Sequence, residues 1–258
     1  MKRFLAAVIA FTALAMTACG GSSDENGAAS DGRQKRTDAA SSAGSVSENS
    51  SENISENSDT ETSDDAAEAE QEEKEDSKIL IAYFSLGENN GLSDDVDADA
   101  SASVAVVNGN VSGNTGVIAD YIRQATGGDT FSILTEYYYP ENYDETLTVA
   151  QQEIENGERP VLASHIDNLD EYDTIFIGFP NWWYGLPAPM DSFFEEYDFS
   201  GKTIIPFVTS GGSGFSDTIE EIKAYEPNAS VLDGLAIYYT DVSDAQSEVN
   251  EWIAGLEL

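Results

Sequence analysis

Apolar residues from position 78 onward fall into short runs, and amphipathic segments separate these runs. Each run is short, rich in β-branched or aromatic residues and bounded by turn residues, which is typical of a buried strand. The predicted strands cover 78–84, 130–134, 174–179, 203–209 and 231–238, the last interrupted by Asp233 and Gly234. The predicted helices cover 115–126, 142–156, 190–197, 218–225 and a final segment from 243. Strands that alternate with helices predict parallel pairing and right-handed crossovers.

The helical segments carry apolar stripes that define their expected buried faces. The stripes are Val117, Ile118, Tyr121 and Ile122 in the first helix, Leu147, Ala150 and Ile154 in the second, and Val249, Trp252, Ile253 and Leu256 in the last. Ser243 with Gln246 three residues later has the spacing of a capping box. Five such strands predict an α/β domain, a doubly wound three-layer sandwich. In this architecture ligands bind at the carboxyl ends of the strands, near the switch in strand order.

The N-terminal residues have the pattern of a secretion signal. Lys2 and Arg3 precede an apolar run over 4–18, which is shorter than the ~20 residues of a spanning helix. Cys19, the single cysteine of the chain, follows small residues as in a bacterial lipobox. We expect residues 1–18 to be a lipoprotein signal peptide and Cys19 to be lipidated. An ordinary signal peptide with an incidental cysteine is the alternative.

Residues 19–77 are rich in Ser, Glu, Asp, Asn and Ala, with Ser-Glu-Asn repeated at 47, 51 and 55. Val46 and Ile54 are their only large aliphatic residues and aromatic residues are absent, so no core can form. The pattern predicts a disordered acidic tether, solvated throughout and transiently helical at most over 64–76. The folded domain is expected to cover 78–258.

Polar loops follow three of the predicted strands. Ser85 follows the first strand, and Gly113, Asn114 and Thr115 open the first helix, where free N–H groups and the helix dipole favour an anion. An aromatic loop over 180–185 follows the third strand, and a glycine-rich loop over 209–214 follows the fourth. Each loop alone is also typical of an ordinary cap or turn. Their shared position after strands predicts a ligand site.

These residues resemble the flavodoxins, and specifically the extracytoplasmic flavodoxin-like proteins of bacteria. The resemblance runs through AYFS, GNT, LDEYDTIFIGFPNWW, DFSGKTIIPFVTSGGSGF and the closing helix, nearly the whole of 78–258. It implies a flavodoxin-like sandwich with strand order 2-1-3-4-5 and FMN held without a covalent bond. The implied phosphate ligands are Ser85, Gly113, Asn114 and Thr115. The implied ring contacts are Pro180, Asn181, Trp182, Trp183, Tyr184 and Gly185 on one side and Thr209, Ser210, Gly211, Gly212 and Ser213 on the other.

One departure from ordinary short flavodoxins concerns the phosphate loop. Twenty-six residues, 86–111, separate Ser85 from the SGNT segment, which leaves the part played by Ser85 open. Residues 104–107 could form a small edge strand within this insertion. In the aromatic loop we expect one tryptophan to stack on the flavin and the other to pack beneath it, with Trp183 favoured over Trp182 as the contact. Burial of both in a helix interface is the alternative.

Composition excludes several other functions. The formal net charge is −38, and the excess of acidic over basic residues within 78–258 excludes nucleic-acid binding, which needs a basic surface. His165 is the single histidine and lies away from the predicted edge, and no nucleophile elbow surrounds Ser213, because Phe215 stands where its last glycine would be. Neither a serine hydrolase nor a His/Cys metal centre is expected. The acidic cluster Asp94, Asp95, Asp97 and Asp99 is interpreted as solvated surface.

Two main functional classes remain. The first is an FMN-binding electron-transfer protein, lipid-anchored outside the cytoplasm, whose redox partner is a protein or a small molecule and which has no catalytic side chain of its own. The second is an FMN-dependent NAD(P)H or quinone reductase. A flavin-free binding module on the same fold is a weaker third alternative.

Overall fold

The computed structural model describes residues 33–36, 78–91, 104–107, 109–256 and 258. The expected signal peptide, Cys19, the Ser-Glu-Asn repeats and the acidic cluster at 94–99 lie outside the described residues. No described helix is long and apolar enough to span a membrane.

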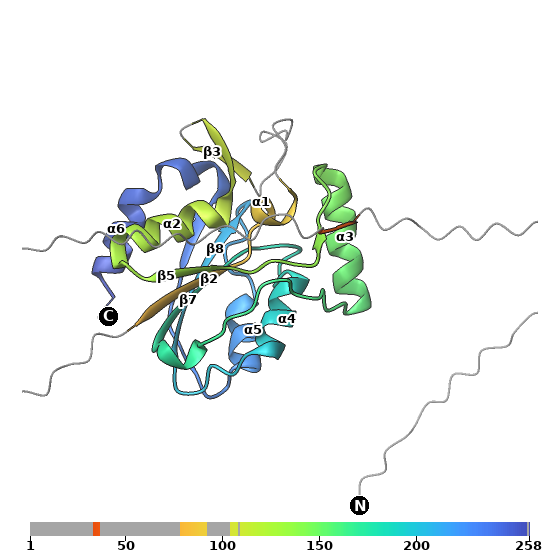
Figure 1. The fold of residues 1–258 in the computed structure, drawn as a ribbon. Coiled ribbons are helices and arrows are strands. Elements are labelled where there is room, and N and C mark those ends of the chain that lie inside the picture. The colour runs from red at the N-terminus through yellow and green to blue at the C-terminus, as the bar shows by residue number, and fades with distance from the viewer. Residues whose placement is uncertain (1–32, 37–77, 92–103, 108, 257) are drawn as a thin grey trace, which may run out of the picture. The chain divides into compact units, whose positions relative to one another are not determined.

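A parallel sheet forms the centre of the domain (Figure 1). Its five main strands are β2 (Ile79–Tyr83), β5 (Asp129–Ser132), β7 (Thr174–Pro180), β8 (Thr203–Ser210) and β10 (Leu235–Tyr238). They lie in the order β5-β2-β7-β8-β10, which is the expected order 2-1-3-4-5. The strand order reverses between β2 and β7, because the chain first extends the sheet on one side of β2 and then continues on the other.

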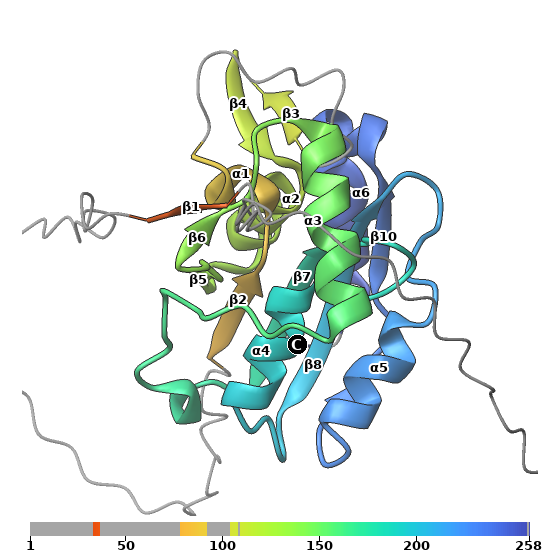
Figure 2. The same ribbon diagram turned by 90° about the vertical axis from the view of Figure 1, so that its right-hand side faces the viewer.

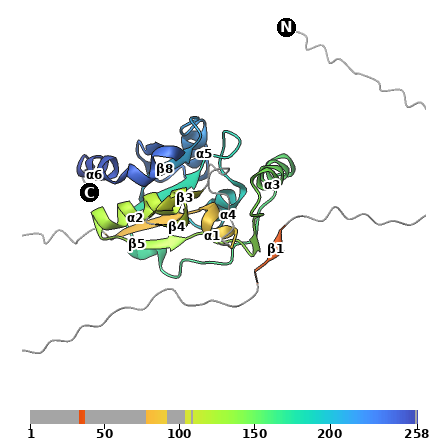
Figure 3. The ribbon, with the colours of Figure 1, turned by 90° about the horizontal axis from the view of Figure 1, so that it is seen from above.

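Helices cover both faces of this sheet. Helices α2 (Asn114–Thr126) and α6 (Gln246–Ala254) pack on one face, and α3 (Tyr143–Asn156), α4 (Ala188–Glu196) and α5 (Thr218–Tyr225) contribute to the core on the other. Side chains of β2 alternate between the faces: Leu80 and Ala82 enter the α3–α5 core, and Ile81 enters the α2–α6 core. Seen from above, α3 stands at the opposite side of the folded domain from α6 (Figure 3).

The predicted fifth strand is broken into two short strands. Residues Ser230–Val231 form β9, which pairs with the start of β8, and β10 pairs with its end. The break lies opposite Pro206, which has no N–H to donate to a neighbouring strand. Gly234 passes so close to Pro206 that an added Cβ would lie 2.2 Å from its carbonyl oxygen, so the Asp233–Gly234 interruption reflects this irregular pairing.

Two helices differ from the sequence-based expectation. The buried face of α3 consists of Thr146, Val149, Ala150 and Glu153, whereas Ile154 is exposed. The expected stripe of Leu147, Ala150 and Ile154 is therefore correct for Ala150 and wrong for Ile154, because Glu153 takes the inward position. The expected capping box is also wrong: Tyr239–Asp244 form a 3-10 turn, η3, and α6 continues from it after Ala245 without a side-chain cap.

The insertion after β2 begins with a short helix, α1 (Leu86–Asn89), and ends with a hairpin of β3 (Val104–Val107) and β4 (Asn110–Gly113). The predicted strand at 104–107 is therefore present, but it belongs to a separate two-stranded sheet. A further 3-10 turn, η2 (Leu169–Glu171), precedes β7.

Four residues of the expected tether are part of the folded domain. Strand β1 (Gln34–Lys35) pairs antiparallel with β6 (Tyr137–Tyr138), and the two lie side by side in Figure 2. The expectation of a tether solvated throughout is wrong for residues 33–36, because they form hydrogen bonds and ion pairs with residues more than 50 positions away.

Candidate functional site

The aromatic loop after β7 forms a tight turn in a strained conformation. The N–H of Gly185 donates to the carbonyl of Trp182 at 3.1 Å, and the two residues form an isolated β-bridge. Between them, Trp183 and Tyr184 have φ angles of 53° and 66°. Turns with two positive φ angles favour Asn and Gly, and this region costs a larger L-residue roughly 1–2 kcal/mol. Backbone strain of this kind is concentrated at functional sites.

The two tryptophans have different environments. Trp182 is buried and makes edge-to-face contacts with Phe84 and Tyr139, at centroid distances of 5.4 and 5.3 Å. Trp183 is 47% exposed and its Nε1 donates to the carbonyl of Leu147 on α3 at 3.3 Å. Tyr184 is 72% exposed. Trp182 is thus part of the core beneath the site, and Trp183 and Tyr184 form its outer rim.

The loop after β8 is fixed by Ser210. Its Oγ accepts hydrogen bonds from the N–H groups of Gly212 and Gly214, at 3.3 and 3.0 Å. Asn181 ties this loop to the aromatic loop: its N–H donates to the carbonyl of Thr209 at 2.8 Å and its Nδ2 to that of Gly214 at 2.7 Å. The Oδ1 of Asn181 is buried and accepts no hydrogen bond from a described residue.

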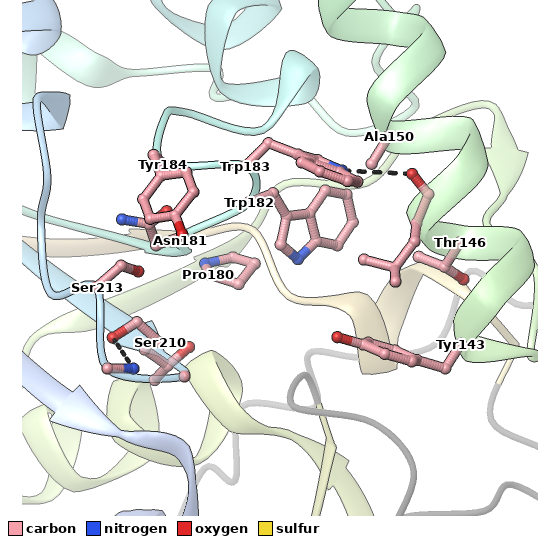
Figure 4. Close-up of a pocket in the computed structure, with 14 residues that line it drawn as sticks. Tyr143, Thr146, Ala150, Pro180, Asn181, Trp182, Trp183, Tyr184, Ser210 and Ser213 are labelled. Atoms are coloured by element: carbon pink, nitrogen blue, oxygen red, sulfur yellow. Dashed lines mark hydrogen bonds between the residues drawn. The ribbon is translucent and has the colours of Figure 1, made fainter.

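These loops enclose a cavity of about 510 Å³ at the carboxyl edge of the sheet (Figure 4). Ser210 lies on one side, Tyr143 of α3 lies on the other, and the tryptophans lie between them. The lining residues are Tyr143, Thr146, Leu147, Ala150, Pro180, Asn181, Trp182, Trp183, Tyr184, Thr209, Ser210, Gly211, Gly212 and Ser213. Every expected ring contact except Gly185, the last residue of the turn, lines this cavity.

Sequence reasoning missed the contribution of α3. Tyr143, Thr146, Leu147 and Ala150 were read as parts of a polar helix with an apolar stripe, yet they line the cavity. Tyr143, Thr146 and Ala150 are three or four positions apart and so share one helix face. A hydroxyl-bearing face on an otherwise acidic helix was the signal that could have identified them.

The expected phosphate residues come together despite the insertion. An added Cβ on Gly87 would lie 2.3 Å from the nitrogen of Gly113, and one on Gly113 would lie 1.6 Å from Ser85 Oγ. The two glycines therefore allow the chain to leave and rejoin the domain at the same point. We call Ser85, Gly87 and Gly113 the neck of the insertion; it places Ser85 beside the start of α2.

The neck does not open into the cavity. Ser85, Asn114 and Thr115 are buried, and Thr115 Oγ1 shares a 2.9 Å hydrogen bond with Thr209 Oγ1 at the cavity wall. The carboxyl of Glu88 lies against the start of α2, where an added Cβ on Gly116 would be 2.4 Å from its Oε1. Burial raises the pKa of Glu88. Ser85 Oγ and Glu88 Oε2 are both buried beside Gly113, and hydrogen bonds from Ser85 and Tyr83 oppose the rise in the pKa of Glu88.

Among the residues that the structure describes, the remaining candidates form no second site. His165 is exposed, and its Nδ1 lies 2.7 Å from Oε1 of Glu196. Among the described residues, no three His, Cys, Asp or Glu side chains are grouped so that they could hold a metal ion.

Two solved structures from Bacteroides have the same fold as this chain. A candidate flavoprotein from Bacteroides uniformis is 28% identical, with a TM-score of 0.53, over 69% of this chain and 98% of that chain. One from Bacteroides eggerthii is 26% identical, with a TM-score of 0.51, over 70% and 99%. A flavoprotein from Lactobacillus acidophilus, solved in complex with FMN, is 20% identical, with a TM-score of 0.45, over 69% and 99%.

Sequence comparison identifies the family. No curated protein matches the chain. The flavodoxin family profile matches residues 101–256, which is more than half of the 258 residues. The matched part carries the start of α2, the aromatic turn and the loop after β8. The chain belongs to the flavodoxin family.

Proposed function

We propose that this protein binds FMN, with the flavin ring in the cavity between the aromatic turn and the loop over 209–213. The observation that carries the proposal is the strained turn, which presents Trp183 and Tyr184 at the rim although their conformation costs free energy. A volume of about 510 Å³ is within the usual range for small-molecule sites. The aromatic surface at Trp183 and Tyr184 suits a flat, apolar ring.

The fit for the phosphate group depends on Glu88. Ser85 and the first residues of α2 provide hydroxyl and N–H donors at a helix start, which suits an anion. A carboxylate at the same place would repel that anion, and Glu88 Oε2 lies close to Ser85 at the neck, because both would contact a Cβ added to Gly113. We therefore assign the phosphate to the start of α2 beside Ser85, which requires the Glu88 side chain to turn aside.

Bound FMN would supply reversible electron uptake, and the chain would set the environment of the ring. Trp182 and the residues around it keep water from beneath the site, and the loop over 209–213 fixes its far edge through Ser210. The exposed rim at Trp183 and Tyr184 leaves one edge open to a redox partner, a protein or a small-molecule acceptor. The proposed location is the outer face of a bacterial membrane, with a lipid on Cys19.

A direct test uses the chain from residue 20 onward, so that residues 33–36 are retained. FMN is added, free flavin is removed by gel filtration, and the visible spectrum and flavin fluorescence are recorded. A retained flavin band with quenched fluorescence is the expected result. A folded protein without flavin would overturn the proposal. Rapid steady-state oxidation of NAD(P)H by the loaded protein would assign it to the reductases instead of the electron carriers.

A further inference from the structure

The basic residues of the N-terminal 77 residues are not evenly distributed. Between positions 20 and 77 there are four, and three of them are Arg33, Lys35 and Arg36. The surrounding sequence is strongly acidic. Relief of the repulsion between its acidic residues would favour basic residues spread along the segment, so it does not explain this cluster. The described part of the structure places the segment Arg33–Arg36 on the folded domain, beside β6 and α3 (Figure 2).

Arg33 provides the counter-ion of a buried carboxyl. Glu153 is 1% exposed and faces inward from α3. Arg33 Nη1 donates to its Oε1 at 2.7 Å, and the buried hydroxyl of Tyr139 donates to its Oε2 at 2.9 Å. Arg33 Nη2 also donates to Oε2 of Glu158 at 3.1 Å. Burial of a glutamate carboxylate costs free energy unless the carboxylate is paired. The inward position of Glu153 on α3 therefore favours a cation beside it.

Arg36 binds the other end of the same groove through neutral acceptors. Its Nε donates to the carbonyl of Thr135 at 3.0 Å, and its Nη2 to the carbonyl of Glu88 and to Oδ1 of Asn89, at 3.2 and 3.3 Å. Its guanidinium carbon lies 4.2 Å from the centroid of the Tyr138 ring. The backbone N–H of Arg36 donates to the carbonyl of Glu136 at 2.7 Å. The groove thus recognises an extended segment with arginines three positions apart.

We propose that residues 33–36 are a latch, which docks the tether onto the groove formed by β6, the inward face of α3 and the end of α1. Its occupant is this chain's own segment, because 41 residues separate Arg36 from Lys78 and can span far more than the domain at ~3.3 Å per residue. The latch is separate from the flavin cavity, and its docking does not depend on the proposed function.

The consequence of docking is a change in the reach of the domain, and this part rests on the proposed lipid anchor at Cys19. With the latch docked, residues 20–32 connect the anchor to the domain; with the latch released, residues 20–77 do. The fully extended length of 58 residues exceeds that of 13 residues more than fourfold at ~3.3 Å per residue. The latch sets two distances between the flavin site and the membrane.

Trypsin tests the docking in the chain from residue 20 onward, because Arg33, Lys35 and Arg36 are cleavage sites and Lys74 is an internal reference. At pH 8 we expect slow cleavage at 33–36 and fast cleavage at Lys74. The double variant Glu153→Gln, Glu158→Gln should raise the ratio of the two rates about tenfold, as expected for the loss of charge-assisted hydrogen bonds. The matched control is Glu155→Gln, which removes one exposed carboxylate from the same helix and should leave the ratio unchanged.

Three outcomes would overturn the latch. The first is equal cleavage at 33–36 and at Lys74 in the unaltered protein, and the second is an equal ratio of the two cleavage rates in the double variant and the control. The third is protection of 33–36 that falls when the protein is diluted, which would show docking onto a second copy. If the double variant does not fold, hydrogen exchange of the unaltered protein tests the docking of residues 33–36 instead. The Arg36 amide should then exchange at least tenfold more slowly than free peptide, and free exchange would exclude docking. Neither measurement uses flavin, so neither result depends on FMN binding.

Discussion

Thr115 and Thr209 share a hydrogen bond between their hydroxyl oxygens, at 2.9 Å, although 94 positions separate them. Thr115 lies in the first turn of α2, beside the neck, and Thr209 lies near the end of β8, at the cavity wall. This bond joins the expected phosphate side of the site to the expected ring side. Both residues are buried, so neither hydroxyl has water as a ready alternative.

Thr115→Val should lower the free energy of unfolding by about 1–2 kcal/mol, because it leaves the Thr209 hydroxyl buried without this partner. Thr115→Ser keeps the hydroxyl and should cost less. In a double-mutant cycle with Thr209→Val, chemical denaturation should show that the second substitution adds little to the first. Strictly additive effects would contradict the importance of this hydrogen bond.

Because the aromatic turn is strained, we expect one substitution in it to raise the stability of the protein and to lower its affinity for FMN. Tyr184→Gly should raise the free energy of unfolding of the flavin-free protein by about 0.5–1 kcal/mol, because glycine adopts a positive φ without the steric cost that tyrosine incurs. The same substitution should weaken FMN binding, since it removes aromatic surface from the rim. Thermal unfolding and fluorescence titration measure the two effects. Tyr184→Asn is the control, because asparagine also tolerates this conformation.

The strands and most helix faces were predictable from the sequence. Apolar runs and 3.6-residue stripes report burial directly, and the sheet and its two cores follow from them. The aromatic turn and the loop over 209–213 were predictable as well, because loops that follow parallel strands meet at one edge of the sheet.

The remaining features depend on partners that are distant in sequence. Glu153 occupies an inward position on α3 because Arg33, 120 residues away, pairs with it; local periodicity placed Ile154 there instead. The docking of residues 33–36 was missed for the same reason, since the segment has no apolar residue to indicate burial. The neck was also unpredictable, because nothing in the spacing of Gly87 and Gly113 indicates that their backbones touch.

The Glu88 carboxylate should lower the contribution of the phosphate group to the affinity for FMN. Riboflavin carries the same ring without a phosphate, so the ratio of the two affinities isolates the phosphate contribution. Glu88→Gln should increase the preference for FMN over riboflavin about tenfold, because it removes a like charge from the start of α2. Asp120→Asn is the control, since Asp120 lies on α2 itself but is exposed and paired with Arg123. Fluorescence titration with both ligands gives the ratio, and an unchanged ratio would place the phosphate elsewhere.

Glu153 should make stability fall as pH rises. Burial raises the pKa of its carboxyl to about 7, against the opposing effects of the Tyr139 hydroxyl and the Arg33 guanidinium, while Glu158 raises it further. The folded state therefore binds a proton more tightly than the unfolded state. This stabilisation is fully present below the unfolded pKa of 4.5 and is lost as pH rises through about 7.

Glu153→Gln removes this titration. The difference in unfolding free energy between the variant and the unaltered protein should change by about 2–3 kcal/mol between pH 4.5 and pH 8. Arg33→Gln removes the guanidinium and should move the decline to higher pH. Urea unfolding across this pH range measures both effects, and a pH-independent difference would show that Glu153 does not titrate here.

The acidic composition should lower the reduction potential of bound FMN below that of free FMN, because a net charge of −38 disfavours the negatively charged reduced form.

Glu221 is the carboxylate to test, since its Oε2 accepts a hydrogen bond from the N–H of Leu186, directly after the aromatic turn, at 3.1 Å. Glu221→Gln keeps the acceptor and removes the charge, and should shift the potential to a more positive value. Glu220→Gln, on the exposed side of the same helix, should shift it less, because solvent and salt screen an exposed charge. Potentiometric titration at low and high salt measures both variants; a potential at or above that of free FMN in the unaltered protein would show that local contacts with the ring outweigh the acidic field.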